Sequence, residues 1–259
     1  MNDTATVVAV ANQKGGVGKS TTSINLATAL ALQGERVVVV DLDPQANATS
    51  GLGIDKSGLN GSTYDVVVGE TPIEDIIEPT AIRDLFVLAS NIDLAGAEIE
   101  LVSMMSREQR LSNALKAVVS EYDFIVIDCP PSLGLLTVNA LAAADEVFIP
   151  IQCEYYALEG VSQLMRNIDL IQLNLNPGLK VEGIVMTMFD ARTTLSQDVV
   201  EQVREHFGDT MYRTIIPRTV RLSEAPSFGE PIETLDPMSR GAIAYRELGR
   251  EFRRRHGRT

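Results

Sequence analysis

The stretch that decides the fold reads Val7-Val8-Ala9-Val10-Ala11-Asn12-Gln13-Lys14-Gly15-Gly16-Val17-Gly18-Lys19-Ser20-Thr21. Its first five residues are apolar and rich in valine, which predicts a strand buried on both faces. A glycine-rich turn follows, and the pattern of residues 20–33 predicts a helix. Strand, glycine-rich loop and helix in this order are the context that a phosphate-binding loop, or P-loop, requires.

The composition of this loop explains why it suits phosphate. Glycines let backbone N–H groups converge on phosphate oxygens without a Cβ clash, and the helix N-terminus adds a partial positive charge. We expect Lys19 to reach the β- and γ-phosphates of ATP and the Ser20 hydroxyl to ligate Mg²⁺. The expected nucleotide-binding residues of the loop are Lys14, Gly15, Gly16, Val17, Gly18, Lys19, Ser20 and Thr21.

A second lysine, Lys14, makes the loop unusual, and Gln13 occupies the position at which the general pattern has glycine. Lys14 is either one more cation near the phosphates of its own subunit or a cation that acts on the nucleotide of another subunit. In the second case it offsets charge on the transferring phosphoryl group, as an arginine finger does. The residues alone do not decide between these roles.

Two aspartates follow the next valine-rich run, Val37–Val40. Asp41 and Asp43 are two residues apart, so the alternation of a strand directs both to the same side. One carboxylate there can orient an attacking water molecule near Mg²⁺·ATP. Alternatively, the two carboxylates cap the following loop, Pro44–Asn47. Spacing alone leaves both possibilities open.

A second apolar run that ends in aspartate, Phe124–Asp128, has the form of a Walker B strand. Asp128 is expected to hold Mg²⁺ through water, because the same chain already carries a P-loop. The run continues as Cys129-Pro130-Pro131-Ser132-Leu133-Gly134. Gly134 allows the backbone to rotate around a γ-phosphate, and the two prolines predict a rigid turn.

The whole chain alternates short β-branched runs with helical patterns, which predicts an α/β fold. We expect one doubly wound, mostly parallel sheet with helices on both faces, in a single domain spanning residues 1–259. The expected strands are Thr6–Ala11, Arg36–Val40, Leu85–Ala89, Phe124–Ile127, Val147–Ile151, Gly183–Met188 and Tyr212–Ile216. The expected helices are Ser20–Gln33, Arg107–Ser120, Leu136–Ala143, Leu158–Leu173, Thr194–His206 and Arg240–Arg255. Residues 50–63 are expected to form a surface loop.

Charge is distributed unevenly along the chain. The net charge of −13 argues against a general nucleic-acid binder. However, residues 190–259 hold 12 Arg and 11 Asp+Glu, and the last 20 residues hold 7 Arg against 2 Glu. A local basic face near the C-terminus is therefore possible despite the acidic whole.

Several other classes of protein are disfavoured. Cys129 and Cys153 form no Cys-x-x-Cys pair and have no histidine at metal-ligand spacing, so buried reduced thiols are expected. The start of the chain has no basic segment of a signal peptide, and no apolar run approaches the ~20 residues of a membrane span. These features predict a cytoplasmic protein.

The loop form Lys-Gly-Gly-Val-Gly-Lys-Ser resembles the deviant Walker A loop of the ParA/MinD family of ATPases. Further runs are similar to those of the chromosomal, Soj-type ParA branch, and the similarity extends from about Val7 to about Tyr245. These runs are Asp128–Gly134, Leu94–Val102, Gln152–Gly160, Thr187–Thr193 and Pro217–Ser227.

The resemblance assigns roles that the residues alone left open. It implies that Lys14 reaches across a dimer interface and that Asp43 is the water-orienting aspartate of switch I, while Asp41 supports Mg²⁺ or the loop. It also implies that Pro217 lies near the adenine and that Arg192 and Arg221 belong to a DNA-binding surface. The implied metal site comprises Ser20, Asp43 and Asp128, and the implied switch residues are Asp43, Pro44, Asp128 and Gly134.

The resemblance implies a function as well. The expected protein is an ATPase that dimerises with ATP and Mg²⁺ and binds DNA without sequence preference. It partitions a chromosome or plasmid with a ParB-like centromere-binding partner, which places it on the nucleoid without stable membrane association. The alternative is a MinD-like membrane-cycling ATPase, which needs a C-terminal amphipathic helix. Here only Leu248 and Phe252 provide apolar residues late in the chain, and both are expected to be core contacts.

Overall fold

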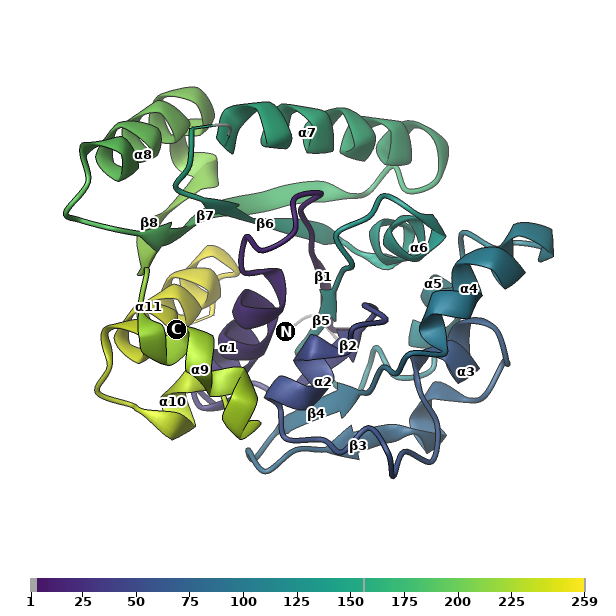
Figure 1. Ribbon diagram of the computed structural model, residues 1–259. Helices are drawn as coiled ribbons and strands as arrows, with labels where there is room; N and C mark the ends of the chain where they lie inside the picture. The colour runs from purple at the N-terminus through teal and green to yellow at the C-terminus, as the bar shows by residue number, and fades with distance from the viewer. Residues whose placement is uncertain (1–3, 156, 259) are drawn as a thin grey trace.

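The computed structural model describes residues 4–155 and 157–258, and its centre is a sheet of eight strands (Figure 1). The strands are β1 (Thr6–Val10), β2 (Val37–Asp41), β3 (Ile77–Pro79), β4 (Leu85–Leu88), β5 (Phe124–Asp128), β6 (Glu146–Gln152), β7 (Lys180–Phe189) and β8 (Met211–Pro217). Their spatial order is β3-β4-β2-β5-β1-β6-β7-β8, and every neighbouring pair is parallel except β3 with β4. Tyr156, in the motif Gln152–Gly160, lies outside the described residues.

Helices cover both faces of the sheet, as expected. One face carries α1 (Lys19–Ala31), α2 (Asn47–Gly51), α9 (Val220–Phe228), α10 (Ile232–Leu235) and α11 (Arg240–Arg255). The other carries α3 (Thr63–Val67), α4 (Leu94–Glu100), α5 (Arg110–Leu115), α6 (Leu135–Ala143), α7 (Ala157–Asn174) and α8 (Thr194–Phe207). Short 3₁₀ turns are η1 (Ile73–Asp75), η2 (Leu101–Ser103) and η3 (Gly208–Thr210).

The strand residues divide between two hydrophobic cores by simple alternation. Val8 and Val10 of β1 belong to the core beneath α1 and α11, whereas Val7 and Ala9 belong to the core beneath α5 and α6. Because both faces are covered, the strand interiors are apolar throughout rather than alternately polar. The prediction of a doubly wound, mostly parallel sheet is confirmed.

The structure adds elements that the sequence patterns did not predict. Residues 50–63, which were expected to form a loop, contain the end of α2. The helices α4 and α9 were also not predicted. The edge strand β3 is antiparallel and only three residues long, ending at Pro79. Proline is tolerated at such an edge because no further ladder hydrogen bond is needed there. The helix expected from residue 107 begins only at Arg110.

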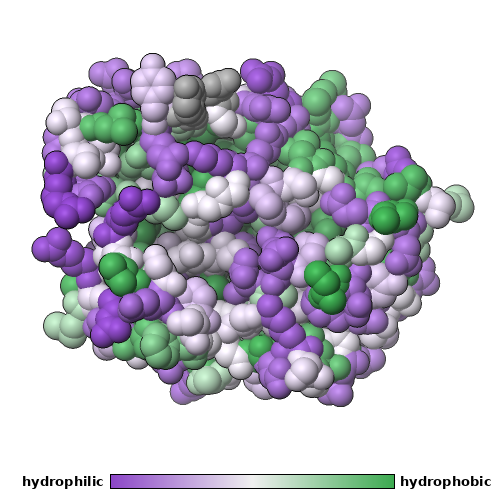
Figure 2. Space-filling view, in the orientation of Figure 1, coloured by the Kyte–Doolittle hydropathy of each residue, from purple (hydrophilic) through white to green (hydrophobic). Residues whose placement is uncertain are grey.

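The parallel strands direct their carboxyl ends to one edge of the sheet, where ligands bind in folds of this kind. The loops after β1, β2 and β5 therefore meet. Among the described residues, no helix is long and apolar enough to cross a bilayer. The face shown in Figure 2 is mostly polar, but apolar atoms gather over α4 and η2, where Ile99, Val102 and Met105 are strongly exposed.

Candidate nucleotide-binding site

The P-loop leaves β1 in the middle of the sheet and enters α1. Gly16 and Gly18 have positive φ values of 74° and 88°, and Gly18 is the N-cap of α1. Nothing lies within 4 Å of a Cβ built at Gly16, so glycine is needed there for its backbone conformation rather than for space. Thr187 of β7 holds the loop by donating a hydrogen bond from Oγ1 to the Val17 carbonyl, at 2.8 Å.

Lys19 is buried at the first position of α1. Its Nζ donates a hydrogen bond to the Lys14 carbonyl oxygen at 3.3 Å, so the side chain folds back over its own loop. Burial lowers the pKa of Lys19, against the opposing effect of the nearby Asp128 carboxylate. A phosphate at this helix N-terminus compensates that buried charge.

The side chain of Lys14 does not fold back over the loop as that of Lys19 does. Its ammonium group forms an ion pair with Glu154, which follows β6, and its side chain is 48% exposed. The Lys14 N–H donates to Asn12 Oδ1 at 3.0 Å, while Asn12 donates to the Pro150 carbonyl at 2.8 Å, which ties the loop to β6. Lys14 does not line the cavity around Lys19 and Ser20.

Asp41, at the end of β2, is fully buried and anchors the loop that follows it. Its Oδ2 accepts hydrogen bonds from both the backbone N–H and the hydroxyl of Thr49, each at 2.7 Å. Burial raises the pKa of Asp41 to about 6. Because Thr49 already occupies this carboxylate, the geometry favours the loop-supporting role for Asp41.

Asp43 is nearly buried and lines the same cavity as Lys19. Its Oδ1 accepts a hydrogen bond from the Gln45 N–H at 2.9 Å, and its carbonyl accepts one from Ser90 Oγ at 2.9 Å. Pro44 follows directly, and Ala46 has a positive φ of 53°, an uncommon conformation for a non-glycine residue. These features fix the position of the loop after β2, which contains the predicted switch residues Asp43 and Pro44.

Asp128 ends β5 beside Asp41 and has one free oxygen. Ser23 donates to its Oδ1 at 2.8 Å, whereas Oδ2 is buried without a hydrogen-bond partner. An orphaned carboxylate oxygen in this position fits a cation or its bound water. Mg²⁺ binds through few protein ligands plus phosphate and water, so a single carboxylate oxygen beside a serine hydroxyl is a fitting set of protein ligands. Ser20, Asp43 and Asp128 therefore fit the predicted metal site.

Two adjoining cavities extend from the P-loop. The first, about 350 Å³, is lined by loop residues including Gly15, Lys19 and Ser20, and by Asp43. The second, about 310 Å³, is lined by Pro217 at the end of β8 and by Tyr245 of α11. Both share the lining residues Gly18, Thr21, Met188 and Pro226. Together they suit phosphates in the first cavity and a base in the second.

Gly134, a predicted switch residue, is in close contact with α4. It is the N-cap of α6, and a Cβ built on it would lie 2.0 Å from Oε1 of Glu98. That oxygen is buried without a hydrogen-bond partner. The motif Leu94–Val102 therefore contributes a side chain, Glu98, that lies against Gly134, a contact that the sequence did not reveal.

The two arginines predicted to bind DNA lie on exposed segments after β7 and β8, and both are paired. Arg192 donates from Nε and Nη2 to the two carboxylate oxygens of Asp190, at 2.9 and 2.7 Å. Arg221 lies 3.3 Å from Glu224 and 3.4 Å from Asp236. Their charges are thus partly neutralised within the monomer.

The cysteines are buried free thiols, as expected. Burial raises the pKa of Cys153 to about 12 and raises that of Cys129 further. Thiols held in the protonated form are poor metal ligands and nucleophiles.

Sequence reasoning missed four residues of the site: Thr49, Ser90, Glu154 and Thr187. Thr49 contacts Asp41 within the same loop region, whereas Ser90, Glu154 and Thr187 act through contacts between segments far apart in the chain. Glu154 and Thr187 had a sequence signal, because they lie in the family-like runs Gln152–Gly160 and Thr187–Thr193, whereas Thr49 and Ser90 had none.

The P-loop after β1, the aspartates that end β2 and β5 and the cavities beside them define a P-loop nucleoside triphosphatase. A protein-family model described as an AAA domain matches residues 5–181. The sporulation initiation inhibitor protein Soj of Bacillus subtilis is 57% identical, covering 95% of this chain and 97% of that protein. The chromosome partitioning protein ParA of Myxococcus xanthus is 54% identical, covering 96% and 88%. The chain belongs to the Soj and ParA family of chromosome-partitioning ATPases, which confirms the resemblance seen in its motifs.

Solved structures agree with this fold. A Mycobacterium smegmatis structure named cobyrinic acid a,c-diamide synthase, with a bound ATP analogue and magnesium, has a TM-score of 0.83 and 41% identity, covering 95% of this chain and 93% of that one. The Pyrococcus furiosus cell division ATPase MinD has a TM-score of 0.81 and 27% identity, covering 96% and 99%. MinD is thus the more distant relative.

Proposed function

We propose that this chain is a single-domain, Mg²⁺-dependent ATPase that dimerises with ATP, binds DNA without sequence preference and partitions a chromosome or plasmid. The observation that carries this proposal is the arrangement of two lysines in one P-loop. Lys19 is folded into its own phosphate cavity, whereas Lys14 points away from it and is half exposed. A cation so placed is available to the nucleotide of a second subunit.

The remaining residues supply the parts of a hydrolytic switch. When bound, Mg²⁺ neutralises charge on the phosphates. Ser20 and Asp128 hold the metal, and Asp43 orients the attacking water from its fixed position. Pro44 and Gly134 flank the site. The segments that begin at these two residues change conformation with the bound nucleotide. Pro217 contacts the base.

The alternative, a MinD-like membrane cycle, has less support. Leu248 and Phe252 of α11 have no exposed surface, so the apolar face of this helix already packs on the sheet. The chain is also less similar to MinD than to Soj and ParA. The name of the Mycobacterium smegmatis structure suggests an amidating enzyme, but its identity of 41% is below the 57% and 54% of the partitioning proteins.

A ParB-like partner follows from the proposed function, and α4 offers a surface that supports it. Ile99, Val102 and Met105 are 79%, 59% and 91% exposed. No Lys or Arg lies between Arg83 and Arg107, whereas Asp and Glu occur there. An apolar surface with an acidic rim suits a basic, partly apolar segment of a partner. This surface adjoins the contact between α4 and switch II.

The oligomeric state tests the proposal directly. We expect sedimentation to give a monomer with Mg²⁺·ADP and a dimer with Mg²⁺·ATP, and Asp43→Ala to keep the dimer because it blocks hydrolysis. Lys14→Ala should remain monomeric with ATP, whereas the control Lys56→Ala should behave as wild type. A Lys14→Ala protein that dimerises and hydrolyses ATP normally would remove the main support for the proposal.

A further inference from the structure

Three exposed arginines of the C-terminal third lie at the opposite end of β8 from Pro217 and the segment that carries Arg221. Within the described part of the chain, the side chains of Arg204, Arg213 and Arg254 are exposed, and no hydrogen bond or ion pair engages their guanidinium groups. Each therefore keeps its full charge and its donors available to an anion.

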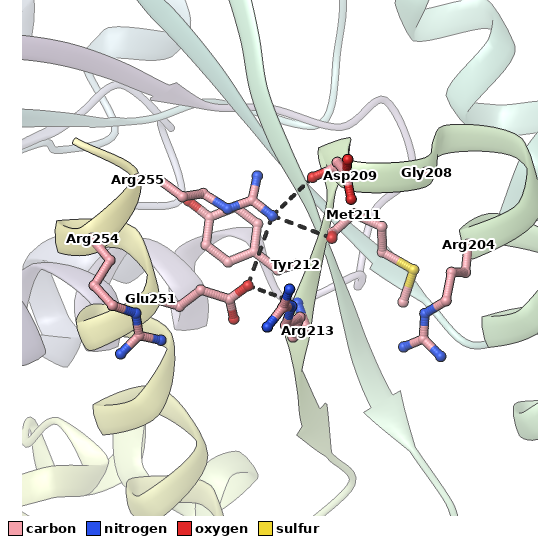
Figure 3. Close-up of a pocket in the computed structure, with 9 residues that line it drawn as sticks. All are labelled: Arg204, Gly208, Asp209, Met211, Tyr212, Arg213, Glu251, Arg254 and Arg255. Carbon is pink, nitrogen blue, oxygen red and sulfur yellow. Dashed lines mark hydrogen bonds and ion pairs between the residues drawn. The ribbon is translucent and has the colours of Figure 1, made fainter. Parts of the chain in front are cut away.

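These three arginines come together in one groove, which Figure 3 shows in close-up. The groove measures about 660 Å³ and is formed by α8, by η3 with the start of β8, and by the last turn of α11. The side chains of Arg254, Arg213 and Arg204 spread in a row across it, from α11 over β8 to α8 (Figure 3). Because Met211 is the first residue of β8, the groove lies at the edge of the sheet opposite to the nucleotide cavities.

A fourth arginine, Arg255, forms the floor of the groove. Arg255 lies over the ring of Tyr212, with its guanidinium carbon 3.9 Å from the ring centroid. Its Nη2 donates to the Asp209 carbonyl at 3.0 Å and to the Met211 carbonyl at 3.2 Å. These contacts hold the end of α11 against β8. They therefore fix the position of the neighbouring residue Arg254 at the groove.

The groove remains cationic after its acidic residues are considered. Glu251 is buried, and its carboxylate already accepts hydrogen bonds from the N–H groups of Arg213 and Thr214, at 2.8 and 2.9 Å. Asp209 is exposed at the rim and is the one carboxylate there that opposes an anion. Four arginines against two carboxylates leave an excess of positive charge.

We propose that this groove binds the phosphate backbone of duplex DNA, as a contact surface additional to Arg192 and Arg221. The inference rests on the proposed function and assigns part of the DNA-binding surface of the protein to this groove. Exposed guanidinium groups in a row suit an extended chain of phosphates and carry no base preference. An anionic membrane is a poorer fit, because the apolar lining residues Met211 and Tyr212 are buried and cannot insert.

The salt dependence of DNA binding tests the inference. A variant carrying Arg204→Gln, Arg213→Gln and Arg254→Gln is compared with a control of equal net charge carrying Arg83→Gln, Lys116→Gln and Arg166→Gln. Anisotropy of a labelled random-sequence duplex is measured with Mg²⁺·ATP over a range of KCl concentrations. We expect the groove variant to lose at least roughly tenfold in affinity, and the slope of log K against log salt to fall by about 1 for each lost contact. The control should retain the wild-type slope.

Two controls distinguish loss of DNA contacts from loss of folding. Circular dichroism and Tm establish that the groove variant is folded, and a variant with three Arg→Lys changes should recover most of the binding because it keeps the charge. Wild-type affinity and slope in the folded groove variant would overturn the inference while leaving the proposed function intact. Loss of binding to anionic vesicles with DNA binding unchanged would overturn it in favour of a membrane. Absence of ATP-dependent DNA binding in the wild type would overturn both proposals.

Discussion

Asp41 and Asp128 are register partners at the ends of the parallel strands β2 and β5, and neither has exposed surface. Burial raises the pKa of both, and for Asp128, to about 7, the charge of Asp41 adds to the effect of burial. Two adjacent buried carboxylates destabilise the metal-free protein, and they do so beside the proposed Mg²⁺ site.

Asp128→Asn should therefore raise the stability of the metal-free protein and lower its ATPase activity. Removing the charge should stabilise the metal-free protein by about 1–3 kcal/mol at pH 8, while hydrolysis should fall by at least roughly 100-fold because the metal loses its proposed ligand. Urea denaturation in EDTA and a phosphate-release assay measure the two effects. Asp169→Asn, an exposed change on α7, is the matched control. A destabilised Asp128→Asn protein would refute the account of the pair.

The same pair predicts a pH dependence. Because the folded-state pKa values lie above the unfolded value near 3.8, the folded protein binds more protons between about pH 4 and pH 7. Its stability should therefore decrease as the pH rises through that window and then level off. The difference between wild type and Asp128→Asn in EDTA, measured by urea denaturation from pH 5 to 8, isolates this contribution. A difference that does not vary with pH would contradict it.

Glu154 should restrain Lys14 in the monomer. Glu154→Gln releases the lysine for the second subunit, but both side chains are about half exposed, so the effect is modest. We expect ATP-dependent dimerisation to strengthen by up to about fivefold. Sedimentation at several protein concentrations measures the change, with Glu121→Gln as control. Weaker dimerisation would show that the ion pair belongs to the active form.

Gly134→Ala tests the contact between the proposed switch residue Gly134 and Glu98 of α4. The backbone at Gly134, with φ −82° and ψ −173°, is open to alanine, so the cost arises from the collision with Glu98. We expect hydrolysis to fall in Gly134→Ala and to recover in the double variant Gly134→Ala, Glu98→Ala. Failure of the second change to restore activity would mean that Gly134 acts through its backbone alone.

Much of this site could be predicted because its determinants are local. The P-loop and the aspartates after two buried strands depend on short runs of sequence, and α11 occupies the expected residues Arg240–Arg255. The ion pairs were not predictable in the same way. Lys14 pairs with Glu154 across 140 positions, and the arginine groove forms only when α8, β8 and α11 pack together. The pairing of Arg192 with Asp190 is local, but its geometry depends on the turn between them.

In the proposed function, ATP controls DNA binding. Binding of a random-sequence duplex is measured at low and moderate salt with Mg²⁺·ATP and with Mg²⁺·ADP, for wild type and for Asp43→Ala. We expect salt-sensitive binding with ATP, little binding with ADP, and binding retained in Asp43→Ala. Equal binding in the two nucleotide states, or none in either while ATP hydrolysis is intact, would contradict it.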